Sequence, residues 1–275
     1  MKNVLVRSLS GIVYVALIVL ALVAGQNWST ALFSIFCVVA MLELQRITMG
    51  QVTNGNKVAA RALDILVALS MCNVAYILDF PEIAGITCIG IIFGYGLLRF
   101  IVALYDKSKS ALADVAWSML SIGYIALPIA LVNVLCSEQD GWKIVLTMFV
   151  MIWLNDTGAY CVGSICGRTP LFPRLSPKKS WEGFFGGLAF CVAAGVGASV
   201  VVGQPFSMLE WIAFGVMVCL LSTWGDLFES LIKRTNGIKD SGNIIPGHGG
   251  ILDRIDSFLF ASIGVFVVMF FVDMI

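Results

Sequence analysis

Long apolar stretches alternate with short polar ones along the sequence, and this pattern predicts helices that cross a membrane. Nine stretches approach the roughly 20 residues that such a helix needs. To within several residues they are 9–25, 29–45, 62–79, 83–104, 112–135, 143–164, 183–203, 207–228 and 254–275. The first resembles a signal peptide, but the runs that follow favour a retained helix. We therefore expect an all-α, polytopic integral membrane protein.

The basic residues predict the orientation of these helices. With the amino terminus inside, every one of the 17 Lys and Arg residues except Lys143 falls in an inside segment or at its helix end. The outer loops instead carry Asp79, Glu82, Glu138 and Asp140. This asymmetry indicates an odd number of spans, with the carboxyl terminus outside.

Composition agrees with a membrane protein and excludes other classes. Hydrophobic residues make up 59% of the 275 positions and charged residues 12%, whereas soluble domains carry about 25% charged residues. Outer-membrane barrels have short alternating segments rather than long apolar runs. The 8 cysteines form no C-x-x-C pair and there is 1 histidine, so a zinc or multi-histidine site is not expected.

Six acids lie within or beside the predicted spans, where a charged group costs about 2.5–3.5 kcal/mol at a helix centre. They are Asp156, Glu182, Asp226, Glu229, Asp253 and Asp256. Salt bridges to Arg168, Lys233 and Arg254 would explain single acids. Six acids around the two longest inside loops, 165–182 and 229–253, favour a functional site instead.

Segment 226–256 is the densest in polar residues. Spacings of three and four place Asp226, Glu229, Ser230, Lys233 and Arg234 on one face of a helix that continues beyond the membrane. A glycine-rich loop follows, and then two acids in the first turn of the last helix. Carboxylates suit Mg²⁺, whereas neighbouring bases and glycine N–H groups suit phosphates, so the pattern indicates a multiply anionic ligand.

Loop 165–182 repeats this theme with Arg168, Arg174, Lys178 and Lys179. Ser180 can cap the following helix, and Glu182 lies near its positive end. A plain positive-inside signal is the alternative explanation for the four bases. Asn155-Asp156 lies deep in the sixth span, and we expect Asp156 to face a water-accessible cavity.

The stretch from Ser230 to Asp256 resembles the signature of the CDP-diacylglycerol synthases, also called phosphatidate cytidylyltransferases. It reads Ser230-Leu-Ile-Lys233-Arg234, four residues, Lys239-Asp240-Ser-Gly242, and then Ile245-Pro246-Gly247-His248-Gly249-Gly250-Ile-Leu-Asp253-Arg254-Ile-Asp256. Segment 176–183 and Asn155-Asp156 also resemble family motifs. The resemblance covers roughly the second half of the chain, and the first half matches in length and hydropathy alone.

The resemblance implies that CTP and phosphatidate give CDP-diacylglycerol and pyrophosphate, in phospholipid biosynthesis. It implies Mg²⁺, accompanied by a second cation such as K⁺, and a homodimer in the inner (plasma) membrane with its site facing the cytosol. Residues 1–140 would form the scaffold and dimer contacts, and 141–275 the catalytic region. No nucleic acid is expected as a partner.

The resemblance and the charge pattern together assign roles to individual residues. Asp226 and Asp253 are the expected metal ligands. The other expected catalytic residues are Lys233, Arg234, Lys239, Asp240, His248 and Asp256. The expected substrate-binding residues are Asn155, Asp156, Arg168, Lys178, Lys179, Ser180, Glu182, Ser230, Gly249 and Gly250.

Two other functions compete with this interpretation. A secondary transporter would use the intramembrane acids as an ion path, but no inverted repeat is apparent and the polar residues gather at one face. A CTP-dependent polyprenol kinase would share the nucleotide and the metal but transfer the γ-phosphate. The products separate the three functions.

Overall fold

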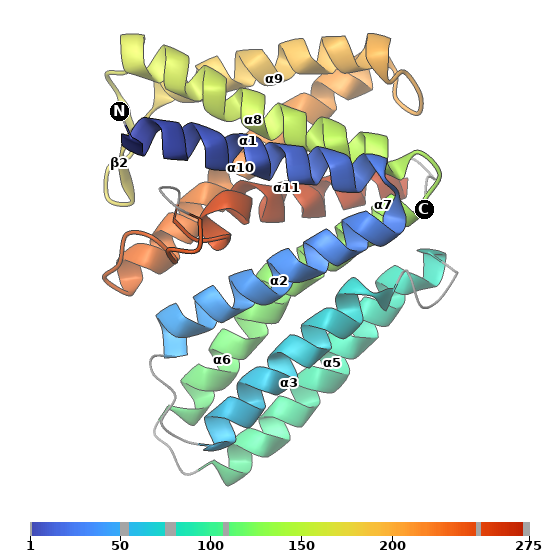
Figure 1. Cartoon of the computed structure of the whole chain (residues 1–275), viewed down its shortest axis with the longest axis vertical. Coiled ribbons are helices and arrows are strands. Elements are labelled where there is room, and N and C mark those ends of the chain that lie inside the picture. The colour runs from blue at the N-terminus through green and yellow to red at the C-terminus, as the bar shows by residue number, and fades with distance from the viewer. Residues whose placement is uncertain (1, 50–54, 75–80, 107–109, 246–248, 272–275) are drawn as a thin grey trace. The chain divides into compact units, whose positions relative to one another are not determined.

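The computed structural model describes residues 2–49, 55–74, 81–106, 110–245 and 249–271, and helices account for most of them (Figure 1). The elements are α1 (Lys2–Val23), α2 (Gln26–Met49), α3 (Gly55–Cys72), α5 (Pro81–Tyr105), α6 (Ala111–Ser121), the π-helix η1 (Ile122–Ala126), α7 (Leu127–Ser137), α8 (Gly141–Cys166), β1 (Pro170–Phe172), β2 (Ser176–Ser180), α9 (Trp181–Val201), α10 (Met208–Thr235) and α11 (Leu252–Phe271).

Among the described residues, 7 helical segments are long and apolar enough to cross a membrane, which confirms a multi-pass membrane protein. They are Gln26–Thr48, Ile86–Tyr105, Ala111–Ser137, Gly141–Cys166, Trp181–Val201, Met208–Thr235 and Leu252–Phe271. The described apolar part of α1, Ser8–Val23, is shorter. Helix α3 has 18 residues and includes Lys57, Arg61 and Asp64, which lower its hydropathy. The predicted count of nine spans is therefore not confirmed.

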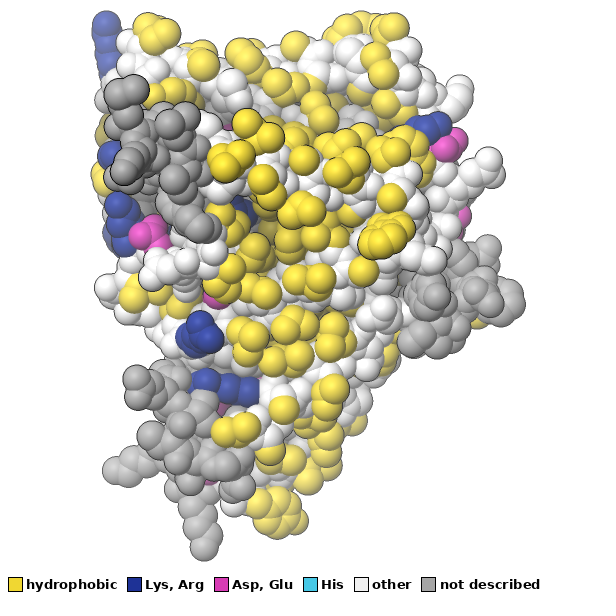
Figure 2. All heavy atoms as spheres, viewed as in Figure 1, with side chains coloured by type: hydrophobic (Ala, Val, Ile, Leu, Met, Phe, Trp, Pro, Cys, Tyr) yellow, Lys and Arg dark blue, Asp and Glu magenta, His cyan; other side chains and the backbone are white. Residues whose placement is uncertain are grey.

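Apolar side chains point outward on these helices, as membrane helices require. Leu9, Ile12, Leu17 and Leu20 of α1 are each at least 48% exposed. Figure 2 shows hydrophobic side chains over much of the visible face. In water such a surface would favour association or aggregation, whereas in a bilayer it contacts lipid.

The described residues group into two compact units. One combines Met1–Trp142 with Asp240–Arg254, and the other combines Lys143–Lys239 with Ile255–Met274. In the first unit α2 packs against α1, α3, α6 and α7, with α2, α3, α5 and α6 side by side in Figure 1. The described residues of 240–254 thus group with the amino-terminal helices, although they lie near the carboxyl terminus in sequence.

Helices of the second unit approach closely through small residues. Gly195 of α9 lies against the backbone of Trp211 and Ile212 on α10, where a Cβ would come within 2.6 Å of the Trp211 carbonyl oxygen. Gly215 of α10 lies as tightly against Cys191 of α9. Small residues let membrane helices pack backbone to backbone, since the hydrophobic effect does not drive association there.

The all-α prediction needs one correction, because the predicted loop 165–182 contains a β-hairpin. Strands β1 and β2 pair antiparallel, with Pro170 opposite Ser180 and Phe172 opposite Ser176. Pro170, Pro173 and Pro177 disfavour a continuous helix through this segment, because proline lacks the N–H that a helix interior needs. In the other predicted loop, α10 continues to Thr235, which confirms the predicted helical extension.

Candidate active site

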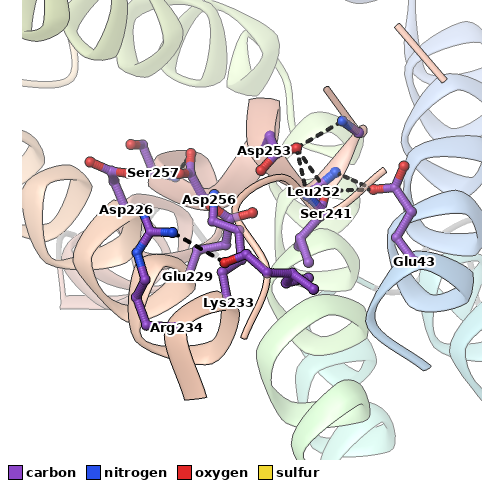
Figure 3. Close-up of polar contacts among 12 residues, drawn as sticks. Glu43, Asp226, Glu229, Lys233, Arg234, Ser241, Leu252, Asp253, Asp256 and Ser257 are labelled. Carbon is purple, nitrogen blue, oxygen red and sulfur yellow. Dashed lines mark hydrogen bonds and ion pairs between the residues drawn. The ribbon is translucent and has the colours of Figure 1, made fainter. Parts of the chain in front are cut away.

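Three carboxylates meet where α10 contacts α11 in the second unit. Asp226 and Glu229 belong to α10 and Asp256 to α11, and one oxygen from each lies within 4.8 Å of the others (Figure 3). Glu229 is fully buried and Asp256 is 8% exposed. The helices meet closely because Gly225 faces α11, where a Cβ would lie 2.6 Å from the Asp256 carbonyl oxygen. We call these three acids the carboxylate cluster.

Two lysines offset part of the negative charge of this cluster. The Lys179 ammonium, on β2, forms an ion pair with Asp226. Lys233 forms an ion pair with Glu229, one turn earlier on α10. Burial lowers the pKa of Lys179 below its usual value, while Asp256 and then Asp156 act in the opposite direction. The neighbouring acids therefore offset part of the effect of burial on Lys179.

The oxygens of the carboxylate cluster match the donor preference of a hard divalent cation. Mg²⁺ binds oxygen ligands in octahedra at about 2.0–2.1 Å, so adjacent ligand atoms lie about 3 Å apart and opposite ones about 4 Å apart. The separations in the cluster, up to 4.8 Å, need only small side-chain movements to reach that range. Asp226, Glu229 and Asp256 could therefore hold Mg²⁺ with water or phosphate oxygens completing its shell.

A cavity of about 410 Å³ borders Asp226 within the second unit. It is lined by helices α8–α11 and by both strands, β1 and β2. Its polar lining comprises Asn155, Asp156, Tyr160, Ser164, Lys178, Lys179, Ser180, Ser222, Thr223, Asp226 and Ser257. Asn155 is 5% exposed and donates to Ser222 Oγ at 3.2 Å. The exposed Asp156 lines the cavity, as the sequence predicted, and the mixture of acids, amides and lysines suits a polar ligand.

The hairpin that carries Lys178 and Lys179 is fixed where it meets α9. Ser180 accepts a hydrogen bond from Gly183 N at 3.1 Å, which confirms the predicted helix cap. The Glu182 carboxylate accepts from the backbone N–H groups of Arg168 at 3.1 Å and Thr169 at 3.2 Å. Ser180 and Glu182 thus position the two lysines at the cavity.

Asp253 has a different environment, within the first unit. Its Oδ2 accepts hydrogen bonds from Ser241 N at 2.9 Å, Ser241 Oγ at 3.0 Å and Gly250 N at 2.8 Å (Figure 3). These contacts bring the two ends of segment 241–250 to the first turn of α11. Asp253 therefore holds Ser241 and Gly250 against the start of α11.

Glu43 of α2 supports the same loop and is 1% exposed. It accepts hydrogen bonds from Ile251 N at 3.1 Å and Leu252 N at 2.9 Å, and its Oε2 lies 3.1 Å from Ser241 Oγ, where it competes with Asp253 for the single hydroxyl hydrogen (Figure 3). The donors include N–H groups at the amino terminus of α11, which lack partners within the helix. A carboxylate at this position also complements the helix dipole.

The glycines of this loop are required by close packing. Gly249 has φ +87°, in the region that favours glycine. A Cβ on Gly250 would collide with Ser241 Oγ and the Glu43 carboxylate. Gly250 therefore packs against Glu43 and Ser241, and Gly249 packs against Asp253; that either glycine contacts substrate stays a prediction.

The remaining predicted residues lie in varied environments. Ser230 is 9% exposed. Arg234 is exposed and its Nη1 donates to the Ile238 carbonyl oxygen at 3.1 Å, beyond the end of α10. Lys239, Asp240 and Arg168 are exposed. His248 lies outside the described residues.

The sequence interpretation missed three acids that the structure gives clear roles. Glu229 was noted among the intramembrane acids but was not assigned to the site, and the structure places it in the carboxylate cluster. Glu43 and Asp64 also lie within predicted spans and are 1% and 0% exposed. The high cost of an acid at membrane depth was the signal that could have identified both.

The fold and the site define a class before any comparison is made: a multi-pass membrane protein with a polar cavity beside a cluster of acids and lysines. A model of the cytidylyltransferase family matches residues 5–272. The chain belongs to the cytidylyltransferase family.

Individual relatives match a shorter part of the chain. A phosphatidate cytidylyltransferase of Staphylococcus aureus is 41% identical over 168 residues, which cover 59% of this chain and 63% of the relative. One from Staphylococcus epidermidis is 36% identical over 166 residues, with the same coverage of 59% and 63%. A chloroplastic phosphatidate cytidylyltransferase 5 of Arabidopsis thaliana is 49% identical over 128 residues, 45% of this chain and 32% of the relative.

Proposed function

We propose that the chain is a phosphatidate cytidylyltransferase, which converts CTP and phosphatidate into CDP-diacylglycerol and pyrophosphate. The observation that carries the proposal is the carboxylate cluster, with Lys179 and Lys233, at a polar cavity of a membrane protein. The family match and the names of the relatives support the same reaction.

The reaction joins two anions, so its main difficulty is electrostatic. A phosphate oxygen of phosphatidate attacks the α-phosphorus of CTP, and the bond from that phosphorus to the oxygen bridging to the β-phosphate breaks. The nucleophile is already anionic at neutral pH, so no strong general base is needed. Positive charge must instead bring the substrates together and stabilise the departing pyrophosphate.

The carboxylate cluster is the proposed Mg²⁺ site. Bound Mg²⁺ would supply Lewis-acid stabilisation of phosphate oxygens. Asp226, which lines the cavity, would be one ligand, and Glu229 and Asp256 would be the other two protein ligands. That Asp253 binds metal, and that K⁺ accompanies Mg²⁺, remain predictions from the resemblance.

The chain's bases have separable proposed roles. Lys178 is exposed and lines the cavity, which suits direct contact with a substrate phosphate. Lys179 and Lys233 each pair with an acid, so they orient the carboxylate cluster as well as adding positive charge. Arg234, Lys239, Asp240 and His248 are proposed to contact or orient the nucleotide, on the strength of the resemblance.

The proposal includes the membrane arrangement. Nine spans would place the amino terminus and both polar loops in the cytosol and the carboxyl terminus outside, in the inner membrane, with two copies forming a homodimer. Helices α1 and α3 would be the two spans beyond the seven that meet length and hydropathy requirements. A topology reporter fused after Ile275 should then behave as external to the cytosol.

The decisive experiment is product analysis with purified protein in detergent. CTP, phosphatidate and Mg²⁺ should yield pyrophosphate and a lipid that carries CMP, in equal amounts. Formation of CDP and a phosphorylated lipid would instead indicate a lipid kinase. No turnover by a well-folded protein would contradict the proposal. The Asp226→Asn variant is the control for a contaminating activity.

A further inference from the structure

The cavity beside the carboxylate cluster also contains neutral polar groups that the reaction, as described so far, does not use. Asn155 of α8 and Ser222 and Thr223 of α10 belong to its lining. All three are buried, and both helices are long and apolar enough to span a membrane. Polar side chains are costly at membrane depth, so three of them at one cavity point to a polar ligand. We call these three residues the neutral layer.

Neighbouring helices fix the orientation of Asn155. Its Oδ1 lies against Gly187 of α9, where a Cβ would come within 2.3 Å. Its Nδ2 donates to Ser222 Oγ at 3.2 Å, and Ser222 uses its own hydrogen for the Cys219 carbonyl oxygen at 3.2 Å. An amide NH₂ group has two hydrogens and Ser222 takes one of them, so the other is left for a ligand in the cavity.

Thr223 supplies a second donor to the neutral layer. The neighbour of its hydroxyl is the thiol of Cys219, one turn earlier on α10. A thiol is a weak hydrogen-bond partner, and a hydroxyl rotates to suit its surroundings. A carbonyl oxygen in the cavity would therefore take the hydroxyl hydrogen of Thr223.

The neutral layer lies about one helical turn from the proposed Mg²⁺ site. Ser222 and Thr223 precede Asp226 on α10 by four and three residues, or about 4.5–6 Å along the helix axis. The bases Lys233 and Arg234 lie on the other side of Asp226, in the last turn of the helix. Along α10 the order is therefore neutral donors, acids and then bases.

Phosphatidate carries a matching order of polar groups. Its phosphate is joined through glycerol to two ester groups, whose carbonyl oxygens lie a few bonds away, a distance comparable to one helical turn of about 5.4 Å. Ester carbonyl oxygens accept hydrogen bonds and donate none, which suits the two donors of the neutral layer. A nucleoside would instead bring donors of its own to a layer that already supplies donors.

We infer that Asn155 and Thr223 bind the ester carbonyl oxygens of phosphatidate, while Ser222 orients Asn155. The inference rests on the proposed function and adds a specificity to it: the site favours a diester phosphatidate over a diether analogue, which has no carbonyl oxygens. With the diether, the donors of Asn155 and Thr223 are left unsatisfied in a buried cavity, and this lowers its binding.

Turnover of dioctanoyl phosphatidate and of its dioctyl ether analogue tests the inference, in mixed micelles with CTP and Mg²⁺. We expect kcat/KM for the diester to exceed that for the diether about tenfold or more, the effect of at least one lost hydrogen bond. Equal values would overturn the ester contact and leave the proposed function intact, because both lipids are then substrates. No turnover of either lipid by folded protein would overturn the proposed function and this inference with it.

Variants of Thr223 locate the contact. Thr223→Val keeps the shape of the side chain, so we expect kcat/KM to fall about fivefold or more for the diester alone, with KM for CTP unchanged. Thr223→Ser, which retains the hydroxyl, should keep the preference for the diester. Thr157→Val is the matched control, at an exposed threonine of α8 outside the cavity lining, and should also keep it. Equal losses for both lipids, or a raised KM for CTP with the lipid preference unaltered, would overturn the inference.

If Thr223→Val does not fold, Ser222→Ala decides. Without Ser222 Oγ, the Asn155 amide loses the acceptor that orients it. The preference for the diester should then fall severalfold, and an unaltered preference would overturn the inference.

Discussion

The acids of the two units are stabilised in contrasting ways. In the first unit, Glu43 and Asp253 accept hydrogen bonds from backbone N–H groups at 2.8–3.1 Å and share the Ser241 hydroxyl between them. In the second unit, Asp226 and Glu229 face another acid and are paired with lysines. Backbone N–H groups therefore satisfy the acids of the first unit, whereas the acids of the second unit depend on lysine side chains.

This difference distinguishes acids whose oxygens are held by backbone N–H groups from acids whose oxygens lie near one another, where the proposed cation would bind. Backbone donors have fixed positions, so the carboxylates of Glu43 and Asp253 hold Ser241 and residues 250–252 in place. Lysine side chains can swing away, so a cation or a substrate phosphate can change the partners of Asp226 and Glu229. The four predictions below test this division, starting with the largest expected effect.

Removing charge from the carboxylate cluster should have the largest effect on turnover. Asp226→Asn and Asp256→Asn keep the side-chain shape but remove strong oxygen ligands for Mg²⁺. We expect each to lower Mg²⁺-dependent turnover of CTP with phosphatidate about a hundredfold or more, about 2.7 kcal/mol of transition-state stabilisation. Initial rates at saturating substrate over a series of Mg²⁺ concentrations measure this.

The two changes act on one proposed metal site, so their effects should not add. The double variant should be little worse than the worse single variant. The Asp253→Asn variant makes the same change at an acid of the first unit. The family resemblance predicts that its loss of turnover is similar to that of Asp226→Asn. A folded Asp226→Asn protein with near-normal turnover would refute the cluster as the metal site.

Glu43→Gln should mainly reduce stability. Glutamine has the same size, but its NH₂ group cannot accept from the N–H groups of Ile251 and Leu252. We expect the free energy of unfolding in detergent to fall by about 1–3 kcal/mol, the usual value of a hydrogen bond to a charged group or of a buried donor left unsatisfied. Denaturant titration of the purified protein measures this change.

Arg46→Gln, on the same helix, is the matched control for Glu43→Gln and should leave stability within about 0.5 kcal/mol of the original protein, as expected for an exposed side chain. In the surviving folded Glu43→Gln protein, the Mg²⁺ concentration at half-maximal turnover should be unchanged. A strong shift in that concentration would mean that Glu43 influences the metal and not the loop alone.

The Glu229→Gln variant tests whether activity needs this acid, as its place in the carboxylate cluster indicates, or does not, as the family motif implies. The resemblance does not require an acid here and predicts a mild loss, whereas the structure places Glu229 in the carboxylate cluster. From the geometry we expect turnover to fall about tenfold, or about 1.4 kcal/mol, with a higher Mg²⁺ requirement. A loss under twofold at every Mg²⁺ concentration would favour the motif and restrict Glu229 to pairing with Lys233.

Lys178→Ala should have the smallest effect. The side chain is exposed and lines the cavity, so it binds substrate charge that is present in both the ground state and the transition state. We expect KM for CTP or phosphatidate to rise about fivefold with kcat unchanged. Arg174→Ala, at an exposed residue of the same hairpin outside the cavity lining, should change neither constant. A large fall in kcat for Lys178→Ala would make this lysine catalytic.

Local patterns predicted the elements of this protein well. Apolar runs of helical length marked the described membrane helices, because burying backbone groups in a bilayer requires helices that satisfy their own hydrogen bonds. Ser180 was recognised as a helix cap, and the three- and four-residue spacing from Asp226 to Arg234 predicted the extension of α10. Each of these features depends on residues within one or two turns of each other.

The pairing of acids could not be predicted in this way. Asp226 and Asp256 meet because Gly225 lets α10 touch α11, and Glu43 reaches Ser241 across 198 positions of sequence. Asp64 likewise depends on Tyr95 and Ser118 from two other helices. Which side chains face each other across helices is set by the register and closeness of packing, and the one-dimensional pattern of apolar and polar residues does not encode these quantities.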